Sequence, residues 1–517
     1  MAQQRFFDHW SGLLQEPALQ RQWSAAFVAG LIMLLPLILG VDLYVDDLER
    51  AMDGRLSWVR VGRPGADVLV EWLNFGRPAT AVSPLYTLLA IAVLSAVGVV
   101  CARAYGVRSP LWTALASLPL MAQPYALQAM SYGFDSLFMA VSLACAVTAA
   151  LLVNLNSHWR VVAGAWILQL LSFNLYQPGA NGFLVMTGCL CVASALDLLN
   201  RPWQVLSLPR RLWMSALVYA GGYGTYRLLI ALFFEHRLNG YAISSAELKP
   251  LDASLPLEVF KSAIEPLQQL LRDFGHWPLV LPFLLLGFVY VALVIQWRSW
   301  KVALSAVTAL LLVALVAPGG MLLLSESFVR HPRVLLYFGP LLTSVILQLL
   351  ALSRLVERPL WRLGVIPMIW LMVVVSYAYG HAFAAQGRFE QSRLSRIVGA
   401  ASVLQARAPE KHLRALAVEG TMPRSPVLQN TAKKFPLIDR LIPPLLDGNT
   451  TFSMTQLRLH GLQFEQRRPS QLKTSGSDQC EPSIDAICTS EFSLQRIGDR
   501  DLLLQLNPKL ASKRPRT

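Results

Sequence analysis

Apolar windows, separated by short polar segments, dominate the chain up to about residue 384. A helix needs about 20 mostly apolar residues to cross the hydrocarbon core of a bilayer. About eleven windows meet this need, each bounded by charged, proline or aromatic residues. They lie near residues 24–41, 82–101, 111–130, 137–154, 161–176, 182–199, 213–234, 277–296, 302–324, 334–353 and 363–384. The pattern predicts an all-α polytopic membrane domain with about eleven transmembrane helices.

The hydropathy falls after residue 385, and the remaining chain has the turns and short strand patterns of a soluble domain. We therefore expect a transmembrane domain over 1–384 and a soluble α+β domain over 385–517. Two polar stretches inside the first domain are long enough to be large loops: a first outer loop at 42–81 and a second at 235–276.

Composition supports a membrane protein. Only 15% of the residues are charged, whereas soluble domains carry about 25%. The net charge of +14 is compatible with nucleic acid, but arginines at membrane edges fit anionic lipid head groups and phosphate-bearing substrates better. We expect membrane lipids as partners and no nucleic acid. The first apolar run is long enough to span and lacks a small-residue cleavage site, so it is not expected to be a signal peptide.

Basic residues in the short loops predict the orientation. With a cytoplasmic N-terminus, the inner loops contain most of the loop Lys and Arg residues, as the positive-inside rule requires. These are Arg103, Arg108, Arg160, Arg201, Arg210, Arg211, Arg298, Lys301, Arg354, Arg358 and Arg362. Two opposite loops, 131–136 and 176–181, contain none, whereas the first and fourth outer loops do carry basic residues. An odd number of spans places the C-terminal domain outside.

The cysteines agree with that orientation. Cys480 and Cys488 lie in the polar C-terminal region, and their spacing suits a disulfide that closes a small loop. Such a bond needs an oxidising compartment. The other four cysteines lie in or beside apolar runs, where a thiol behaves as a small apolar group. The Cys and His spacings resemble no zinc site, and no metal site is expected.

The first outer loop begins with the carboxylates Asp46 and Asp47 directly after a predicted span. Arg50 follows four and three residues later, so a short helix would pair it with either carboxylate. A charge-balanced loop is the simpler interpretation. However, charge close to the membrane is costly, and the "VGRP" turn brings Arg63 back to the same face. A carboxylate near arginines at a membrane face suits a base acting on a substrate whose phosphate the arginines bind.

Polar residues also interrupt the predicted outer face at two short loops. In "SYGFDS", Asp135 stands before a helix, where it can cap free N–H groups or, with Tyr132, line a sugar pocket. In "YQPGAN", Tyr176, Gln177 and Asn181 surround a Pro-Gly break between two spans. Buried amide and hydroxyl groups must be hydrogen-bonded, so these side chains either tie the helical hairpin together or contact the substrate.

A third outer-face segment, "SESFVRHPR" at 325–333, contains Arg330, His331 and Arg333. Two interpretations are open: arginines that extend to the interface, or a phosphate site. The chain has no Walker loop, no dinucleotide fingerprint after a strand and no nucleophile elbow. The glycine-rich "GGYGTYR" at 221–227 lies inside an apolar window, which favours close helix packing over phosphate binding.

Four stretches, in this order and spacing, carry a family resemblance: "VDDLERAMDGRLSWVRVGRP", "SPLYTLL", "MSYGFDSLFMAV" and "FNLYQPGANGF". Over about residues 30–350 the chain resembles the GtrII-type glucosyltransferases of bacterial inner membranes. The resemblance implies a GT-C-like fold and transfer of a glucosyl or other hexosyl residue from an undecaprenyl-phosphate carrier to O-antigen polysaccharide at the periplasmic face. It also implies that an acidic residue in the first outer loop serves as the catalytic base, and this position matches Asp47 or Asp46. The outer side, which includes the C-terminal domain, would then be the periplasm.

Physical chemistry assigns further roles within that expectation. An inverting transfer needs a carboxylate that takes the acceptor proton and cations that stabilise the departing phosphate. We expect no cofactor and no metal, because arginines can neutralise a phosphate monoester. The expected phosphate-binding residues are Arg63, Arg330, Arg333 and Arg50. The expected sugar- or acceptor-binding residues are Tyr132, Asp135, Tyr176, Gln177, Asn181 and His331.

Other functions fit parts of the pattern. A secondary transporter or lipid-sugar flippase would place ionisable residues near the bilayer midplane, but here charges gather at one face. A polysaccharide ligase or polymerase, or a transferase that modifies a protein such as pilin, would use the same outer-face loops. Expected partners are the lipid-linked sugar, an envelope glycan acceptor, a flippase and a donor synthase at the cytoplasmic face.

Overall fold

The structure is a computed structural model that describes residues 16–41, 43–155, 158–200, 207–407, 413–448, 452–467, 469–471, 483–498 and 500–506. The chain divides into two units. The first unit comprises residues 1–39 and 56–379, and the second comprises residues 40–55 and 380–517. The segment 40–55, from the predicted first outer loop, therefore belongs to the same unit as the C-terminal region.

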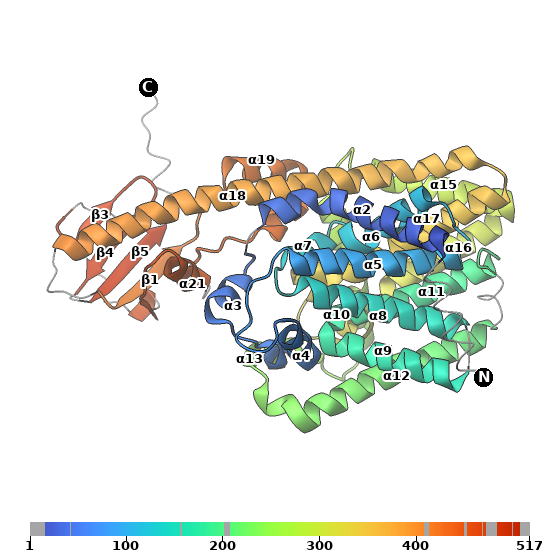
Figure 1. Ribbon diagram of the computed structural model, residues 1–517, viewed down its shortest axis with the longest axis horizontal. Helices are drawn as coiled ribbons and strands as arrows, with labels where there is room; N and C mark the ends of the chain where they lie inside the picture. Colours follow the sequence, from blue (N-terminus) through green and yellow to red (C-terminus); the bar gives the residue numbers. More distant parts are fainter. Residues whose placement is uncertain are drawn as a thin grey trace. The chain divides into compact units, whose positions relative to one another are not determined.

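Helices make up the first unit (Figure 1). The long ones are α2 (Pro17–Gly40), α5 (Leu85–Ala104), α6 (Pro110–Ala122), α8 (Ser136–Leu155), α9 (Trp159–Leu175), α11 (Gly182–Ala195), α12 (Leu208–Leu229), α15 (Leu281–Trp297), α16 (Trp300–Val316) and α17 (Phe338–Leu355). Helix α18 (Ile366–Arg407) begins in the first unit and continues into the second. A helix lies in each predicted window. Among the described residues, seven helices are long and apolar enough to cross a membrane, and three further apolar helices are shorter. A mostly helical membrane domain is thus confirmed, while the number eleven and the GT-C fold stay predictions.

Further helices, all but α14 short, fill the segments between these spans. They are η1 (Trp58–Val61), α4 (Pro64–Leu73), α7 (Ala126–Ser131), α10 (Gln177–Ala180), η3 (Ile230–Phe234), η4 (Glu235–Arg237), α13 (Gly240–Ser245), α14 (Leu255–Phe274), η5 (Gly319–Leu323), η6 (Phe328–Arg330), η7 (Pro332–Tyr337) and η8 (Pro359–Val365). Proline begins several of them, because its fixed backbone angle suits the first helical turn.

Helix α8 lies in the middle of the bundle and packs against α5, α9 and α11. Small polar side chains lock α8 to α9. Ser142 Oγ lies 2.9 Å from the Ser172 carbonyl oxygen and 2.8 Å from that of Tyr176, and Ser172 Oγ donates to the Ser142 carbonyl at 2.7 Å. Small residues allow close backbone approach between spans, and their hydroxyl groups bond across the helix pair. This lock fixes the segment that begins at Tyr176.

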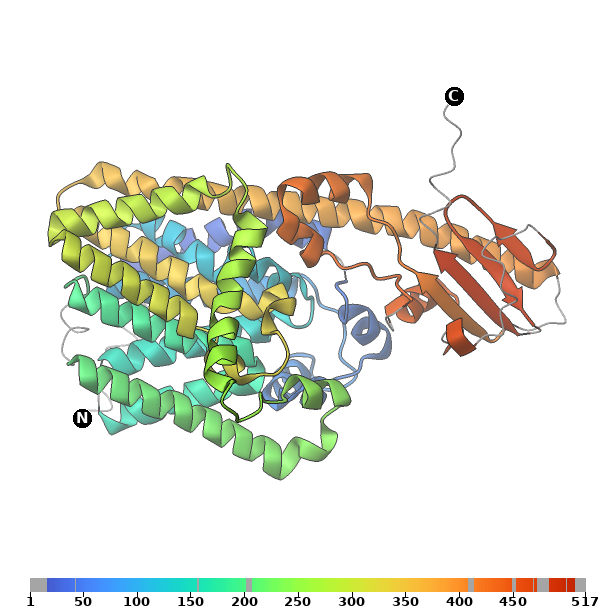
Figure 2. The same cartoon turned by 180° about the vertical axis from the view of Figure 1, so that it is seen from behind.

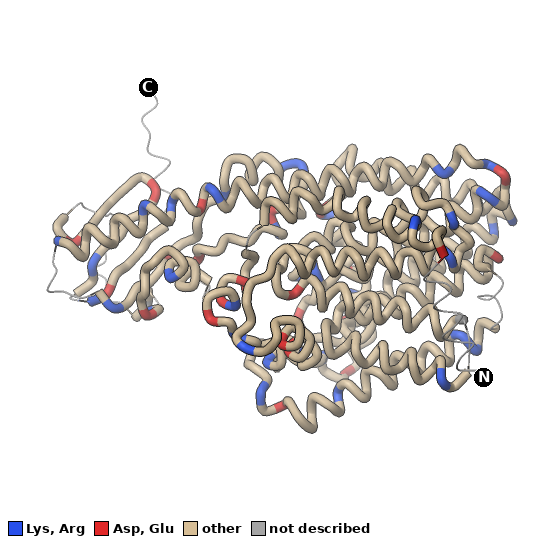
Figure 3. The backbone as a smooth tube through the Cα atoms, in the orientation of Figure 1, with Lys and Arg blue, Asp and Glu red and all other residues tan. Residues whose placement is uncertain are grey.

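The predicted inner loops gather at one end of the bundle. Arg354 donates to the Gly106 carbonyl at 2.7 Å, Asn200 donates to the Arg103 carbonyl at 2.7 Å, and Arg298 forms an ion pair with Asp197. Figure 3 shows the long helices mainly in tan, with charged residues towards their ends. The structure therefore groups these loops as the positive-inside pattern predicted, while their cytoplasmic location stays a prediction.

The second unit contains a five-stranded mixed sheet in the order β2-β1-β5-β4-β3. Its strands are β1 (Ala415–Gly420), β2 (Glu465–Arg467), β3 (Ala486–Cys488), β4 (Ser493–Ile497) and β5 (Asp501–Leu506). Its short helices are α3 (Asp47–Asp53), α19 (Pro426–Lys434), α20 (Pro436–Leu441), α21 (Phe452–Leu459) and η9 (Pro469–Gln471). Strand β1 runs parallel to β2 and β5, whereas β3, β4 and β5 are antiparallel.

Alternating leucines explain why the sheet forms. Leu502 and Leu504 of β5 pair with Leu416 and Val418 of β1 and point to the same core as Leu394 of α18. The predicted α+β character of the C-terminal region is therefore confirmed.

A candidate sugar-phosphate cavity

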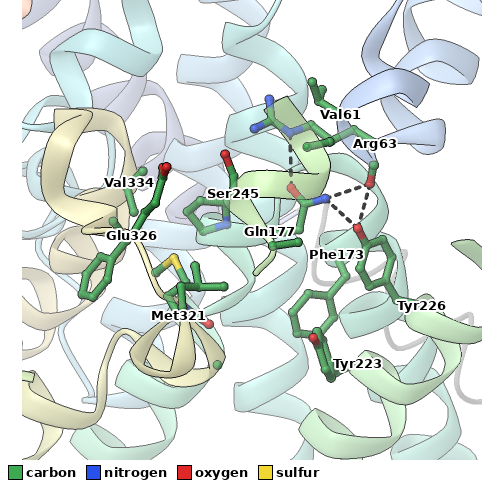
Figure 4. Close-up of a pocket in the computed structure, with 18 of the residues that line it drawn as sticks. Val61, Arg63, Phe173, Gln177, Tyr223, Tyr226, Ser245, Met321, Glu326 and Val334 are labelled. Atoms are coloured by element: carbon green, nitrogen blue, oxygen red, sulfur yellow. Dashed lines mark hydrogen bonds between the residues drawn. The ribbon is translucent and has the colours of Figure 1, made fainter. Parts of the chain in front are cut away.

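A cavity of about 330 Å³ lies in the first unit, where four segments far apart in the sequence meet. Its walls come from the turn after η1, from α10, from the end of α12 with α13, and from the stretch between η5 and η7. Figure 4 shows Arg63 and Gln177 on one wall and Met321 and Glu326 on another. All four segments were predicted to lie on the outer face, and the structure brings them together.

Arg63 is held in the cavity wall by a network around Gln177. Arg63 Nε donates to Gln177 Oε1 at 3.2 Å, and Gln177 Nε2 donates to the Gly62 carbonyl at 2.7 Å and contacts the Tyr226 hydroxyl at 2.8 Å. The Arg63 guanidinium also stacks on the Tyr176 ring, 4.7 Å from its centre. These contacts orient the guanidinium and leave its terminal nitrogens for an anionic ligand.

Gly62 makes this network possible. Its backbone has φ +73°, and a Cβ atom there would lie 3.0 Å from the Tyr226 hydroxyl and 3.4 Å from Gln177 Nε2. The Tyr226 hydroxyl donates to the Gly62 carbonyl at 2.9 Å. A larger residue would be strained and would crowd the partners of Arg63. The predicted "VGRP" turn is therefore part of the cavity.

Two further arginines line the cavity: Arg227, on the last turn of α12, and Arg330, on η6. Both side chains are exposed. Within the described ranges, no hydrogen bond or ion pair engages Arg227 or Arg330. His331 also lines the cavity, and Glu326 contributes one carboxylate. Three guanidinium groups against one carboxylate make the cavity electropositive, as an anion site requires.

Aromatic side chains form much of the cavity lining. Phe173, Tyr219, Tyr223, Tyr226 and Tyr241 all face the cavity. The Phe173 ring stacks on Tyr226 with centroids 5.8 Å apart. Flat apolar faces with hydroxyl edges suit the ring of a sugar, whose C–H face is apolar and whose hydroxyl groups need hydrogen-bond partners. Cations and aromatic rings therefore occur side by side in one cavity.

The segment that carries Glu326 is fixed by backbone pairing. The Lys249 N–H donates to the Leu323 carbonyl at 2.9 Å, and the Ser325 N–H donates to the Glu247 carbonyl at 2.9 Å. The Lys249 ammonium also donates to the carbonyl groups of Leu322 and Leu324. The loop after α13 and the end of η5 therefore form one rigid lip of the cavity.

Asp135, a predicted sugar-pocket residue, belongs to a buried cluster of Trp58, Asp67 and Asp135, here called the Trp58 cluster, and the other predicted sugar-pocket residue, Tyr132, is also buried. The Trp58 indole N–H donates to Asp135 Oδ1 at 3.1 Å. Both Asp67 oxygens accept backbone N–H groups, from Trp58 at 3.0 Å and Val59 at 2.9 Å. Arg333 stacks on Tyr132, 4.8 Å from the ring centre. The proposed roles of Tyr132, Asp135 and Arg333 in substrate binding stay predictions.

Asn181 shows the tying role that the sequence left open. Asn181 Nδ2 donates to the Pro318 carbonyl at 2.7 Å, and Asn181 Oδ1 accepts from Tyr219 at 2.6 Å. Asn181 therefore joins α11, α12 and the segment before η5 while lining the cavity. Tyr176 is buried beneath Arg63.

The carboxylates Asp46 and Asp47 lie in the second unit, at the start of α3. The predicted pairing with Arg50 is present: the guanidinium lies 3.8 Å from Asp46 and 3.9 Å from Asp47. The Asp47 side chain is fully buried and accepts the Tyr44 N–H at 3.2 Å. The Asp46 side chain is 39% exposed. Of the two carboxylates, Asp46 is therefore the more accessible to a substrate.

Helix α3 is anchored within the second unit. The Tyr44 hydroxyl donates to the Leu441 carbonyl at 2.7 Å, and Asp53 pairs with Arg458 at 3.3 Å. Val45, directly before Asp46, has a backbone φ of +49°. This angle is an outlier for a β-branched residue, and strain of this kind costs on the order of 1–3 kcal/mol. The surrounding contacts therefore hold Asp46 in a conformation that the chain would not adopt alone.

The predicted disulfide is described only at Cys488, and residues 76–78 form a second Gly-Arg-Pro sequence. Cys488 is disulfide-bonded, whereas Cys480 lies outside the described residues. Arg77, in the second Gly-Arg-Pro sequence, pairs with Glu71 at 2.8 Å. The hydrogen bond from Arg77 to Glu71 raises the pKa of the Arg77 guanidinium.

Sequence reasoning missed Arg227 and the tyrosines of α12. The glycines of "GGYGTYR" do pack closely as predicted, because a Cβ on Gly221 would lie 2.9 Å from Trp166 and one on Gly222 would lie 3.0 Å from Gln169. The other face of the same turns carries Tyr219, Tyr223, Tyr226 and Arg227 into the cavity. Their spacing of three to four residues, which places them on one helix face, was the available signal.

In the part of the chain that the structure describes, no group of three or more His, Cys, Asp or Glu side chains could hold a metal ion. Metal independence stays a prediction.

Comparisons with known proteins point to one family. The family model described as "Glucosyl transferase GtrII" matches residues 19–344. A protein of Salmonella phage P22, described as an uncharacterized 55.3 kDa protein in the region 5′ of gtrB, is 24% identical over 439 residues, which cover 82% of this chain and 86% of the phage protein. No solved structure matches.

Proposed function

The chain belongs to the GtrII glucosyl transferase family, and we propose that it transfers a glucosyl or related hexosyl residue from undecaprenyl phosphate to lipopolysaccharide O-antigen at the periplasmic face of the bacterial inner membrane. The observation that carries this proposal is the cavity, in which three arginines adjoin a wall of tyrosines. A sugar linked to a phosphate has the same two chemical parts.

The proposed reaction breaks the bond between the anomeric carbon and the phosphate oxygen and forms a bond from that carbon to an acceptor hydroxyl oxygen. The bonding electrons leave with the phosphate, and the acceptor proton passes to a carboxylate. Charge grows on the departing phosphate, so Arg63, Arg227 and Arg330 stabilise the transition state more than the ground state. His331 adds a donor at the same wall.

Two sources for the proton acceptor are compatible with the chemistry. The family resemblance assigns the role to Asp47 or Asp46, and the exposure of Asp46 favours Asp46 over the buried Asp47. Glu326 is a carboxylate of the cavity lining itself. We propose Asp46 as the base and Glu326 as a residue that accepts hydrogen bonds from the sugar hydroxyl groups.

Substitution of each carboxylate separates these roles. Asp46→Asn should abolish transfer and leave donor binding intact. Glu326→Gln should weaken binding of the hexose-linked donor and leave binding of undecaprenyl phosphate, which has no sugar, unchanged. Transfer that persists in Asp46→Asn and disappears in Glu326→Gln would make Glu326 the base.

Mass analysis of envelope glycans tests the function as a whole. Cells with the gene should carry O-antigen one hexose heavier than cells without it, and the Asp46→Asn variant should remove that difference. A hexose gained by pilin instead would redirect the acceptor assignment to protein. Unchanged glycans with altered solute uptake would contradict transferase function and favour a transporter.

A further inference from the structure

Helix α14 has an apolar face that the protein covers only in part, because Ile264 and Leu267 on this face are half-buried while the other apolar side chains are exposed. Its sequence places Leu257, Phe260, Ile264, Leu267 and Leu271 three or four residues apart, so these side chains, here called the apolar stripe, share one face of the helix. Leu257 and Phe260 are each 57% exposed, and Leu271 is 65% exposed. Lys261 and Arg272, each one residue further along, are also exposed but lie on the neighbouring polar flank.

The side of α14 that contacts the protein is partly polar. Asp273 and Gln269 are buried there, and Gln269 Nε2 donates to Asp273 Oδ1 at 3.1 Å. The Tyr125 hydroxyl donates to Asp273 Oδ2 at 2.9 Å. A helix in water would bury its leucines and expose its carboxylate. Here the reverse holds, so water alone does not account for the surroundings of α14.

The direction of α14 differs from that of the neighbouring spans. Figure 2 shows the light-green α14 running crosswise to α15 and α16, and α14 packs against α16, η5 and η6. The next helix, α15, also exposes large apolar side chains, since Leu284 is 57% and Phe288 is 65% exposed. Trp277, between α14 and α15, is 73% exposed. Tryptophan is enriched at the membrane–water interface, where an amphipathic helix lies parallel to the bilayer.

We propose that α14 is an in-plane docking helix for the lipid bilayer. Its apolar stripe lies at the boundary between acyl chains and head groups, and Lys261 and Arg272 lie among the anionic head groups. A lipid surface, rather than a second protein, fits because the stripe is followed in the chain by an exposed tryptophan and a predicted span with exposed apolar side chains, and because exposed basic side chains flank it.

The position of α14 gives this surface a consequence for the cavity. Glu265, on the polar side of α14, accepts a hydrogen bond from Ser327, which lines the cavity. The bilayer surface and the cavity lip are therefore connected through one hydrogen bond and a short stretch of backbone. The docking proposal stands on the exposed stripe alone and does not require the proposed transferase activity.

Nitroxide labels at adjacent positions test the proposal in vesicles of phosphatidylethanolamine and phosphatidylglycerol. The labelled variants are Phe260→Cys with its control Lys261→Cys, and Leu271→Cys with its control Arg272→Cys. Because the free cysteines among the described residues are buried or half-buried, the unsubstituted protein supplies the labelling background. Electron paramagnetic resonance then measures collisions with oxygen, which enters lipid, and with a nickel chelate, which stays in water.

Docking on lipid predicts high oxygen and low nickel accessibility at positions 260 and 271, with the ratio reversed at 261 and 272. High nickel accessibility at all four positions would place α14 in water and overturn the proposal. Low accessibility to both reagents at 260 and 271 would also overturn it, since a protein surface would then cover the stripe.

Discussion

The cavity and the Trp58 cluster both contain polar side chains in the first unit, yet they differ in how completely those side chains are engaged. In the Trp58 cluster, Asp67 and Asp135 receive hydrogen bonds from the Trp58 indole and from two backbone N–H groups, and all three side chains are buried. In the cavity, Arg227 and Arg330 are exposed, and Arg63 uses one nitrogen for Gln177.

This difference separates residues that stabilise the fold from residues that can bind a ligand. A buried carboxylate whose oxygens already accept hydrogen bonds holds the backbone in place. If the carboxylate is removed, the N–H groups that it bonded stay buried without a partner, and this costs their full desolvation free energy. Cations with donors to spare can bind a ligand. The comparison therefore predicts that substitutions in the cavity reduce activity in a folded protein, whereas substitutions in the Trp58 cluster reduce stability.

The largest effect is expected for Arg63→Gln. Removal of a pre-oriented cation from the transition-state phosphate typically costs about 100-fold in rate. Hexose transfer by purified protein in vesicles measures this loss, and the thermal unfolding temperature should stay unchanged. Arg108→Gln is the matched control, because Arg108 is exposed in a predicted inner loop. Equal loss in both variants would contradict a specific role for Arg63.

Asp67→Asn should chiefly destabilise the fold. The new amide places a donor against one of two backbone N–H donors, and an unsatisfied buried group costs about 1–3 kcal/mol. A lower thermal unfolding temperature in detergent measures this loss. An unchanged unfolding temperature combined with abolished transfer would place Asp67 in the chemistry and break the comparison.

Tyr226→Phe should have a moderate effect on activity. The variant removes the hydroxyl that bonds Gly62 and Gln177, so Arg63 is less well oriented. One hydrogen bond is worth about 1 kcal/mol, which corresponds to about fivefold in transfer rate. Tyr223→Phe is the control, since Tyr223 lines the same cavity and is 44% exposed. A larger loss in the Tyr223 variant would show that the hydroxyl groups contact the substrate directly.

Arg77→Gln should have the smallest effect, less than about twofold in transfer rate. Arg77 and Glu71 are an exposed ion pair, and such pairs contribute about 0–1 kcal/mol. A loss comparable to that of Arg63→Gln would show that both Gly-Arg-Pro arginines bind the donor.

The sequence predicted the helices well, because long apolar windows have few alternatives to a spanning helix. It also predicted that Arg63, Gln177, Asn181, Arg330 and His331 lie on one face, and these residues line one cavity. Hydropathy and loop charge predict how far along the membrane normal each residue lies. Residues in loops on the same side of the membrane can therefore be grouped from sequence.

Sequence did not reveal which residues of that face touch. Asp135 bonds Trp58, 77 positions away, and segment 40–55 belongs to the unit formed by residues 380–517. Such contacts depend on helix rotation and on packing between distant segments, which hydropathy does not encode. Arg227 was overlooked for the related reason that a basic residue at the end of an apolar helix resembles an ordinary boundary.

Equilibrium binding of an undecaprenyl-phosphate hexose tests the role of the cavity most directly. Purified protein in vesicles is compared with the double variant Arg63→Gln/Arg330→Gln and with the Arg108→Gln control. Loss of two charge-assisted contacts should weaken binding at least about tenfold in the double variant, while the control binds as the unsubstituted protein does. Unchanged binding in the double variant would contradict the assignment of this cavity as the sugar-phosphate site.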